Sequence, residues 1–278
     1  MIDEASSPAA PISVAERLLI LGGTGEAAAL AEAAHAAFPD LDVISSLAGR
    51  TDAPRTLPGR VRVGGFGGTH GIESFLRHER IGLVIDATHP FAATVSAHAA
   101  AACAATATPR LLLLRPPWQP RPGDRWLEVA DMAEAARLVA TIGRRAFLTL
   151  GPGDLAAFAG ASRVFFLVRL IQPPREPLPF ADHDLVVARP PFNLEAERTL
   201  FARYRIDTLV TKQSGGGAEA KLAAAREVGA AVVMIRRPEK PHGERVATVA
   251  EAMAWLANAL QRHSGRKLPV PKDQASTG

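Results

Sequence analysis

The sequence predicts an α/β protein built from two Rossmann-like parallel-sheet domains with a cleft between them. From residue 18 onward, short apolar runs alternate with alanine-rich segments, the pattern of a parallel sheet covered by helices. The proline-rich stretch PPWQPRPGDR at 116–125 divides the chain into two halves. The halves resemble each other, since LLILGGTGEAAALA at 18–31 is similar to FLTLGPGDLAAFAG at 147–160, as expected for a repeated unit.

The expected elements follow from these alternating runs. In the first half we predict strands at 18–21, 42–46, 60–63, 83–86 and 110–114, and helices at 26–37, 72–78 and 92–105. In the second half we predict strands at 146–150, 164–168, 185–188, 208–211 and 231–235, and helices at 132–142, around Leu155, at 194–204 and at 218–228.

Length and proline content also give domain boundaries. The 278 residues exceed one average domain. We predict an N-terminal α/β domain at 17–118 and a C-terminal α/β domain at 119–262. The polar ends, 1–16 and 263–278, are expected to be a disordered extension and a disordered tail.

Composition argues against several classes of protein. The chain is 47% hydrophobic and 22% charged, it has no apolar run of membrane-spanning length, and its start lacks the apolar core of a signal peptide. We therefore expect a cytoplasmic protein that does not act at a membrane. The net charge is +4 and the basic residues are scattered, so nucleic acid is not an expected partner. The single cysteine, and histidines without ligand spacing, predict no metal site.

The loop GGTGEA at 22–27 is the first candidate binding site. It follows the first predicted strand and opens a helix, where backbone amides and the helix dipole favour a phosphate. The loop departs from the G-x-G-x-x-G pattern, because Thr24 replaces the second glycine and Ala27 the third. The alternative is a tight turn that binds nothing. The predicted cofactor-binding residues are Gly22, Gly23, Thr24, Gly25, Glu26, Ser46, Arg50 and Thr88.

Arg50 bears on the identity of the cofactor. An NAD site places an acidic residue after the second strand, whereas this chain has SSLAGR there. A guanidinium can pair with a 2′-phosphate, so the loop indicates NADPH. The alternative is that Arg50 is a solvated loop charge.

The loop DATHPFA at 86–92 carries the best-placed titratable group of the first half, His89. We expect His89 to bind substrate, and it is the candidate catalytic acid. A histidine at a helix start can also simply cap the backbone, which is the alternative.

Cations and glycines follow the strands of the second half. Three consecutive glycines beside a lysine indicate an anion-binding loop, although a flexible turn is the alternative. A basic rim of this kind suits a polyanionic small molecule. The predicted substrate-binding residues are His89, Arg115, Arg189, Lys212, Ser214, Gly215 and Gly216.

Six motifs, LGGTGEA, SLAGR, DATHPFA, RPPW, ARPPF and TKQSGGGAEAK, occur in this order and resemble the precorrin-6A reductase family of cobalamin biosynthesis. The resemblance covers about residues 18–238. It implies an NADPH-dependent oxidoreductase acting on a CH–CH group, which reduces precorrin-6A to precorrin-6B by hydride transfer to a macrocycle double bond.

The resemblance further implies a tetrapyrrole substrate, whose carboxylates match the predicted cations, and transient contact with neighbouring enzymes of the pathway. It places the cofactor on the first domain and the macrocycle near DATHPFA and the loop 212–217. Two alternatives remain open: an NADPH-dependent reductase of another small cyclic imine or enone, and a non-catalytic nucleotide sensor.

Overall fold

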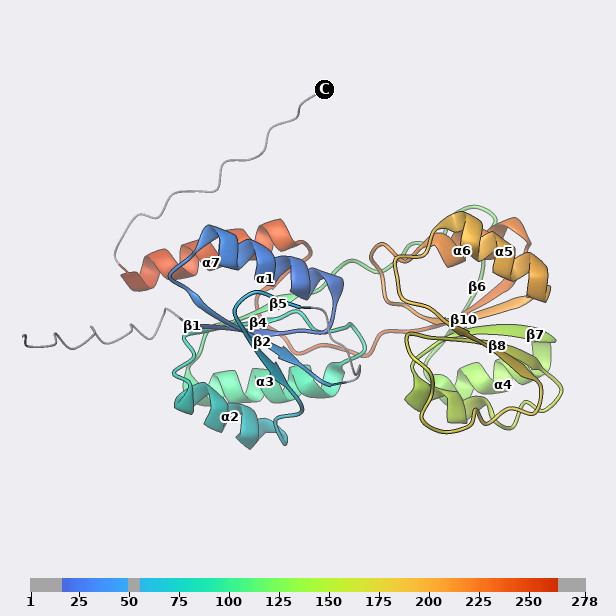
Figure 1. The fold of residues 1–278 in the computed structure, drawn as a ribbon, viewed down its shortest axis with the longest axis horizontal. Helices are drawn as coiled ribbons and strands as arrows, with labels where there is room; N and C mark the ends of the chain where they lie inside the picture. The colour runs from blue at the N-terminus through green and yellow to red at the C-terminus, as the bar shows by residue number, and fades with distance from the viewer. Residues whose placement is uncertain (1–16, 50–55, 265–278) are drawn as a thin grey trace, which may run out of the picture. The chain divides into compact units, whose positions relative to one another are not determined.

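Two six-stranded parallel sheets organise the chain, each with helices on both faces (Figure 1). The computed structural model describes residues 17–49 and 56–264, with only the backbone described at 263 and 264. Unit 1 takes its described residues from 1–114 and 240–278, and unit 2 comprises 115–239. The predicted α/β class with two parallel sheets is therefore confirmed. The predicted extension at 1–16, Arg50, and the tail from 265 lie outside the described residues.

Unit 1 contains sheet A, with the strand order β12-β5-β4-β1-β2-β3. Its strands are β1 (Arg17–Leu21), β2 (Asp42–Leu47), β3 (Arg60–Val63), β4 (Leu83–Asp86), β5 (Arg110–Leu113) and β12 (Arg245–Val246). Its helices are α1 (Gly25–Ala37), α2 (Thr69–His78), α3 (Ala93–Thr106) and α7 (Val249–Ser264).

The core of unit 1 follows from the alternation of side chains along buried strands. Leu18 and Ile20 of β1 point to one face and pack under α1 and α7, whereas Leu19 and Leu21 point to the other face and pack under α2 and α3. Both faces are buried, as the continuous apolar run predicts. Cys103 lies in the second of these clusters with 4% of its surface exposed, and burial raises its pKa to about 11.

Unit 2 contains sheet B, with the strand order β6-β11-β10-β7-β8-β9. Its strands are β6 (Arg125–Val129), β7 (Arg145–Thr149), β8 (Phe165–Leu170), β9 (His183–Val187), β10 (Thr208–Lys212) and β11 (Ala231–Ile235). Its helices are α4 (Met132–Ile142), the 3₁₀ helix η2 (Pro152–Phe158), α5 (Leu194–Tyr204) and α6 (Ala220–Glu227). The helices α5 and α6 cover one face, and α4 packs beside η2 on the other (Figure 1).

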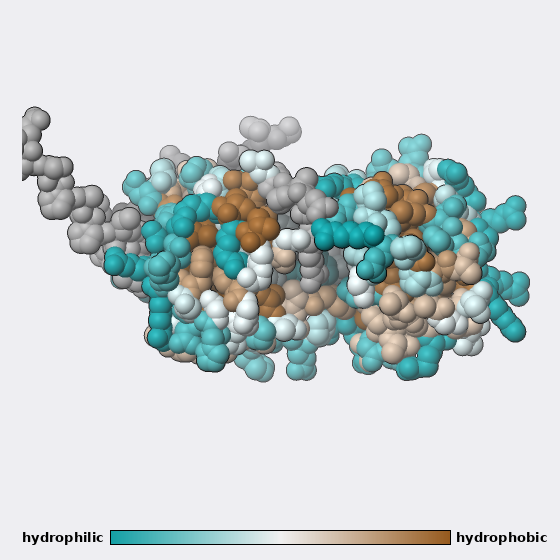
Figure 2. All heavy atoms as spheres, turned by 60° about the horizontal axis from the view of Figure 1, so that its bottom comes forward, coloured by the Kyte–Doolittle hydropathy of each residue, from teal (hydrophilic) through white to brown (hydrophobic). Residues whose placement is uncertain are grey.

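The edge strands are the most exposed apolar segments. Val61 and Val63 of β3 are 43% and 56% exposed, but they alternate with Arg60 and Arg62, whose charges protect the edge from pairing with another chain. On the face drawn in Figure 2, hydrophobic residues accordingly form separate patches among hydrophilic ones.

The domain boundaries predicted at 118 and 262 differ from the structure. Residues 240–262 belong to unit 1, because β12 pairs with β5 and α7 packs beside α1 on sheet A. The chain thus leaves unit 1 at residue 114 and returns at residue 240. Helix α7 also continues to Ser264, two residues into the predicted tail.

Candidate functional site

The glycine turn of unit 1 connects β1 directly to α1. Gly23 has a φ of +103°, a conformation that favours glycine, and a Cβ at Gly23 or Gly25 would meet no atom within 4 Å. The backbone therefore borders open space at the start of a 13-residue helix. The arrangement suits a phosphate, which the amide groups and the helix dipole would bind.

Thr24 holds this turn in place. Its hydroxyl accepts a hydrogen bond from Ala27 N at 3.1 Å and donates one to Ala87 O at 2.8 Å, so it caps α1 and ties the turn to the loop after β4. Gly22 N donates to Ser46 O at 2.9 Å, which joins the turn to the end of β2. The predicted cofactor residues of unit 1 that the structure describes therefore lie together at the carboxyl ends of β1, β2 and β4.

Thr88 belongs to a buried polar network. Its hydroxyl donates to Asp86 Oδ1 at 2.7 Å and accepts from Lys240 Nζ at 2.9 Å. Lys240 Nζ also donates to Ser96 Oγ at 2.6 Å and to Ala92 O at 3.3 Å. Sequence reasoning missed Lys240, because it lies far along the chain in a proline-rich segment and its partners become visible only when the chain returns to unit 1.

The carboxylate of Asp86 is buried with no exposed surface. Its Oδ2 and Arg110 Nη1 lie 4.0 Å apart, and neither atom has a hydrogen-bond partner among the described residues. The pKa of Lys240 is lowered, mainly by burial. The negative charge of Asp86 opposes this effect and raises the pKa, but by less.

His89 follows this network directly. Its Nδ1 accepts a hydrogen bond from Phe91 N at 3.2 Å, which places the proton of the neutral ring on Nε2. The imidazole is half-buried. The local geometry therefore combines the expected backbone contact with a ring nitrogen that can donate a hydrogen bond.

Arg62 is a second cation near the end of β2 that sequence reasoning missed. Its guanidinium donates to Gly64 O at 2.5 Å and Gly65 O at 2.6 Å, approaches Ser46 Oγ at 3.4 Å, and lies 3.8 Å over the Phe66 ring. Burial lowers its pKa. The signal available in the sequence was an arginine in the strand next to β2.

In unit 2, the loop 212–217 follows β10 and is held by donors from elsewhere. Gly215 and Gly216 have φ values of +66° and +73°, and a Cβ on Gly215 would lie 2.0 Å from Pro116 O. Arg115 Nε donates to Ser214 O at 2.8 Å, and Trp118 Nε1 donates to Gly216 O at 2.8 Å. The close approach of Pro116 O thus requires a glycine at 215, and the positive φ favours one at 216.

The remaining predicted cations of unit 2 lie in different surroundings. Lys212 Nζ pairs with Asp154 Oδ2 of η2 at 2.7 Å. Arg189 is exposed and follows β9, at the edge of sheet B. Since β7 and β8 separate β9 from β10, the backbone at Arg189 starts about 14 Å from the end of β10. The structure therefore brings Arg115, Lys212 and the loop together and leaves Arg189 apart.

Lys221, in the first turn of α6, is a further residue that sequence reasoning missed. It is 8% exposed, and its Nζ donates to Thr149 Oγ1 at 3.1 Å. Burial, and then the charge of Arg169, lower its pKa to about 7. The motif TKQSGGGAEAK contains Lys221, but the sequence does not show that the side chain turns inward.

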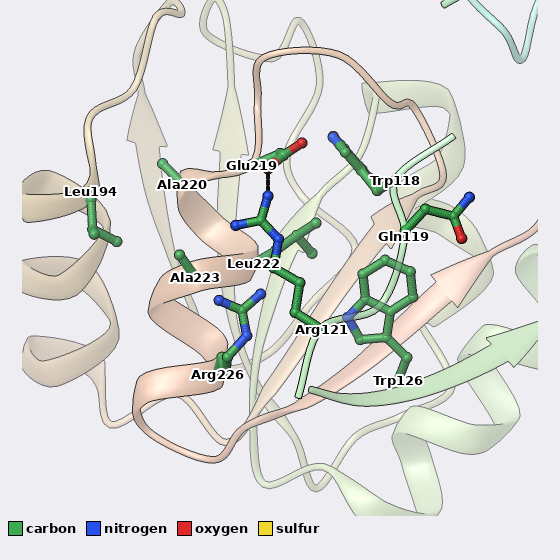
Figure 3. Close-up of a pocket in the computed structure, with 10 residues that line it drawn as sticks. All are labelled: Trp118, Gln119, Arg121, Trp126, Leu194, Glu219, Ala220, Leu222, Ala223 and Arg226. Carbon is green, nitrogen blue, oxygen red and sulfur yellow. Dashed lines mark hydrogen bonds and ion pairs between the residues drawn. The ribbon is translucent and has the colours of Figure 1, made fainter. Parts of the chain in front are cut away.

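A pocket of about 110 Å³ lies between α6 and the segment before β6 (Figure 3). Arg121 extends across it to Glu219, with 2.9 Å between nitrogen and oxygen, and the buried Nε1 of Trp126 has no partner among the described residues. Its lining residues are Trp118, Gln119, Arg121, Trp126, Leu194, Glu219, Ala220, Leu222, Ala223 and Arg226. They include none of the predicted site residues that the structure describes.

Among residues 17–49 and 56–264, no three His, Cys, Asp or Glu side chains gather in a way that could hold a metal ion. In the same ranges, no helix is long and apolar enough to cross a membrane.

The fold is that of an α/β protein with two parallel sheets, and in unit 1 a glycine turn connects β1 to α1. Residues 17–257 match the model of the precorrin-6x reductase family, CbiJ/CobK. The chain therefore belongs to this family. The solved structure titled CobK precorrin-6A reductase matches it with a TM-score of 0.83 and 43% identity, over 87% of this chain and 96% of that one.

Two relatives illustrate the range of sequence identity to this chain. A protein of Rhodococcus erythropolis named precorrin-6A reductase is 48% identical over 248 residues, which are 88% of this chain and 99% of the relative. A protein of Priestia megaterium named cobalt-precorrin-6A reductase is 28% identical over 252 residues, which are 87% of this chain and 98% of the relative.

Proposed function

We propose that this chain catalyses the NADPH-dependent reduction of precorrin-6A to precorrin-6B in cobalamin biosynthesis. The observation that carries the proposal is family membership with 48% identity to a precorrin-6A reductase over nearly that protein's full length. The relative named for the cobalt-containing compound is 28% identical. This difference favours the metal-free macrocycle as the substrate.

The residues of unit 1 suit NADPH. The turn at Gly23 and Gly25 leaves room for a pyrophosphate at the start of α1, and Ser46 at the end of β2 lies at the usual position for the ribose. Arg62 beside Ser46 is a candidate partner of the 2′-phosphate, together with Arg50 from the sequence. When bound, the nicotinamide supplies a hydride for the macrocycle.

The residues of unit 2 suit a molecule that carries several carboxylates. Lys212 and Arg115 bring positive charge to the loop 212–217, whose backbone is fixed by Arg115 and Trp118. A fixed loop orients an anionic substrate without a further loss of conformational entropy on binding. Asp154 already neutralises Lys212 in part, so the substrate competes with that carboxylate.

His89 is the proposed proton donor for the neighbouring carbon of the reduced bond. Its backbone contact through Nδ1 fixes the neutral ring with Nε2 as the hydrogen-bond donor. To act as the acid, the ring takes up a second proton at Nδ1, which breaks the contact with Phe91 N. The exchange His89→Gln keeps a hydrogen-bonding group, and we expect kcat to fall while the KM for NADPH changes little.

Anaerobic incubation with precorrin-6A and NADPH tests the function. We expect oxidation of the cofactor together with a change in the macrocycle spectrum, and a severalfold lower kcat/KM with NADH. The Rhodococcus erythropolis relative serves as the positive control. If the relative oxidises NADPH with the same substrate preparation and this chain does not, the proposed function is wrong. Equal kcat/KM values for the two cofactors would refute the NADPH assignment.

A further inference from the structure

Lys221 forms part of a buried cluster behind the loop 212–217. Its Nζ lies 5.3 Å from the centre of the Trp118 ring and donates to Thr149 Oγ1 at the end of β7. Trp118 in turn bonds Gly216 O through its indole nitrogen. The lysine is thus one aromatic ring away from the loop that is proposed to bind the substrate.

The charges facing Lys221 include one carboxylate, Glu197, which raises the pKa of Lys221 but does not pair with it directly. Arg169 from β8, Glu197 from α5 and Arg115 before β6 are the charged groups that act on it. Glu197 Oε1 already pairs with Arg169 Nη1 at 2.6 Å, and both side chains are at least nine-tenths buried. Among the described residues, Lys221 has no carboxylate within ion-pair distance, and its hydrogen bond is to a neutral hydroxyl.

A buried ammonium in such surroundings is costly. The protein can relieve the cost by releasing the proton, which is the direction in which burial moves the pKa of Lys221. It can also relieve the cost by binding an anion beside the charged form. A bound carboxylate would then add a second negative charge to a cluster that holds three cations, Lys221, Arg169 and Arg115, and one carboxylate, Glu197.

We propose that Lys221 binds a carboxylate of the tetrapyrrole substrate, and that the lysine takes up a proton when the carboxylate binds. The proposal rests on the proposed function for the identity of the anion. Arg169 and Glu197 hold the site in shape, since their pair is buried between β8 and α5 and Arg169 also lies 3.8 Å over the Phe192 ring. Thr149 orients the ammonium from the end of β7.

The linkage between substrate binding and protonation of Lys221 gives the direction in which Kd changes with pH. A carboxylate beside Lys221 stabilises the charged form, so binding takes up a proton wherever the free lysine is neutral. The free group titrates at a pKa of about 7. The Kd should therefore be nearly constant below pH 6 and rise by up to about tenfold per pH unit above pH 7.

Calorimetry on the full chain tests the proposal. Anaerobic titration with precorrin-6A at pH 8, in two buffers of different ionisation enthalpy, measures the protons taken up on binding. We expect an uptake approaching one proton for the wild type. The matched variant Lys221→Arg keeps the charge but cannot titrate, so we expect retained binding and an uptake smaller by that one proton. Lys221→Met should bind at least tenfold more weakly.

NMR of the wild-type side chains provides a measurement that does not depend on a variant folding. The chain has only five lysines, so the signal of Lys221 can be separated in a spectrum of labelled lysine methylenes. We expect the pKa of this signal to rise on addition of saturating sulfate at constant ionic strength, and to rise further with precorrin-6A.

The outcomes separate this proposal from the proposed function. If Lys221→Arg and the wild type take up the same number of protons and the NMR signal does not move with precorrin-6A, Lys221 is not the carboxylate site, even when turnover is normal. If precorrin-6A is never reduced but sulfate still raises the pKa of Lys221, the anion site stands and the proposed reaction fails.

Discussion

Thr24 is the residue on which the geometry of the glycine turn depends. Its hydroxyl is both the cap of α1 and the link to Ala87, so replacing it by valine removes two hydrogen bonds while keeping the shape. We expect Thr24→Val to lower the free energy of unfolding by about 1–2 kcal/mol and to raise the KM for NADPH more than that for the macrocycle.

Thr24→Ser is the matched control for this prediction. Serine keeps the hydroxyl and both hydrogen bonds, so stability and the KM for NADPH should stay near the wild-type values. Urea unfolding and initial-rate kinetics measure the two effects. Equal KM values for Thr24→Val and Thr24→Ser would show that the turn does not position the cofactor.

A second prediction at the residue scale concerns Lys221 and the pH dependence of the free energy of unfolding. In the unfolded chain a lysine titrates near 10.5, whereas in the folded protein its pKa is about 7. Between these values the unfolded state binds more protons, so the contribution of Lys221 to stability rises with pH from about 7 and levels off near 10.5. Urea unfolding in buffers that contain no polyanion measures this contribution.

Lys221→Met lacks the titrating group and provides the reference. The difference in unfolding free energy, wild type minus Lys221→Met, should increase through this pH range. A difference that is constant with pH would mean that Lys221 keeps an ordinary pKa in the folded protein.

The site residues show what local sequence can reveal. Glycine turns and strand-end loops are visible as short patterns, which is why the loops 22–27, 86–92 and 212–217 could be selected as candidates. Lys221 and Lys240 could not, because their partners, Thr149 and Ser96, are far away in the sequence. Arg62 was visible as a cation in a strand, but only the pairing of β2 with β3 brings it to Ser46.

At the scale of elements, Lys240 attaches the returning chain to the loop after β4. Lys240→Met would remove three hydrogen bonds and leave Thr88 and Ser96 with fewer partners. We expect the free energy of unfolding to fall by about 1–3 kcal/mol and hydrogen exchange to increase at 86–96.

Lys212→Met is the matched control for stability. Lys212 pairs with Asp154 at a partly exposed position, so its replacement should cost about 0–1 kcal/mol and leave exchange at 86–96 unchanged. If the two variants lose equal stability, or if exchange at 86–96 stays at the wild-type rate in Lys240→Met, the hydrogen bonds of Lys240 do not stabilise the loop after β4.

The ten strands predicted from apolar runs all occur, with ends shifted by at most two residues. The sequence did not predict β6, β12 or α7. β6 is an edge strand with mostly exposed side chains, and β12 has two residues, so neither shows an apolar run. Helix α7 had a usable signal, the capping box in which Thr248 Oγ1 accepts from Glu251 N and Glu251 Oε2 accepts from Thr248 N.

For the whole molecule, the two sheets have equivalent strand orders. β1 to β5 correspond to β7 to β11, and in each sheet one further strand stands beside the fifth. That strand is β12 in sheet A and β6 in sheet B. Each is followed by a helix, and the two segments are similar, VADMAEAARLVA at 129–140 and VATVAEAMAWLA at 246–257.

Each of these two segments follows the strands of one sheet along the chain but joins the other sheet. β6 and α4 directly follow β5 but join sheet B, whereas β12 and α7 follow β11 but join sheet A. Local patterns cannot predict such an exchange, because either segment has the composition to complete either sheet. This is why the predicted boundary at 262 was wrong although most elements were correct.

The exchange makes unit 2 continuous and unit 1 discontinuous, which predicts different behaviour for fragments. Residues 115–239 contain every strand of sheet B and should unfold cooperatively on their own. Residues 17–114 lack α7, whose Ala252, Leu256 and Leu260 belong to the core over β1, and should not fold alone. Joining 17–114 to 240–264 through a short glycine-serine linker should restore folding.

Circular dichroism during urea titration measures all three fragments. The joined fragment is the matched control for 17–114, because it adds only the returning segment. A cooperative transition for 17–114 alone, with the same midpoint as the joined fragment, would show that β12 and α7 contribute nothing to unit 1. Since α7 covers one face of sheet A together with α1, we expect no such transition.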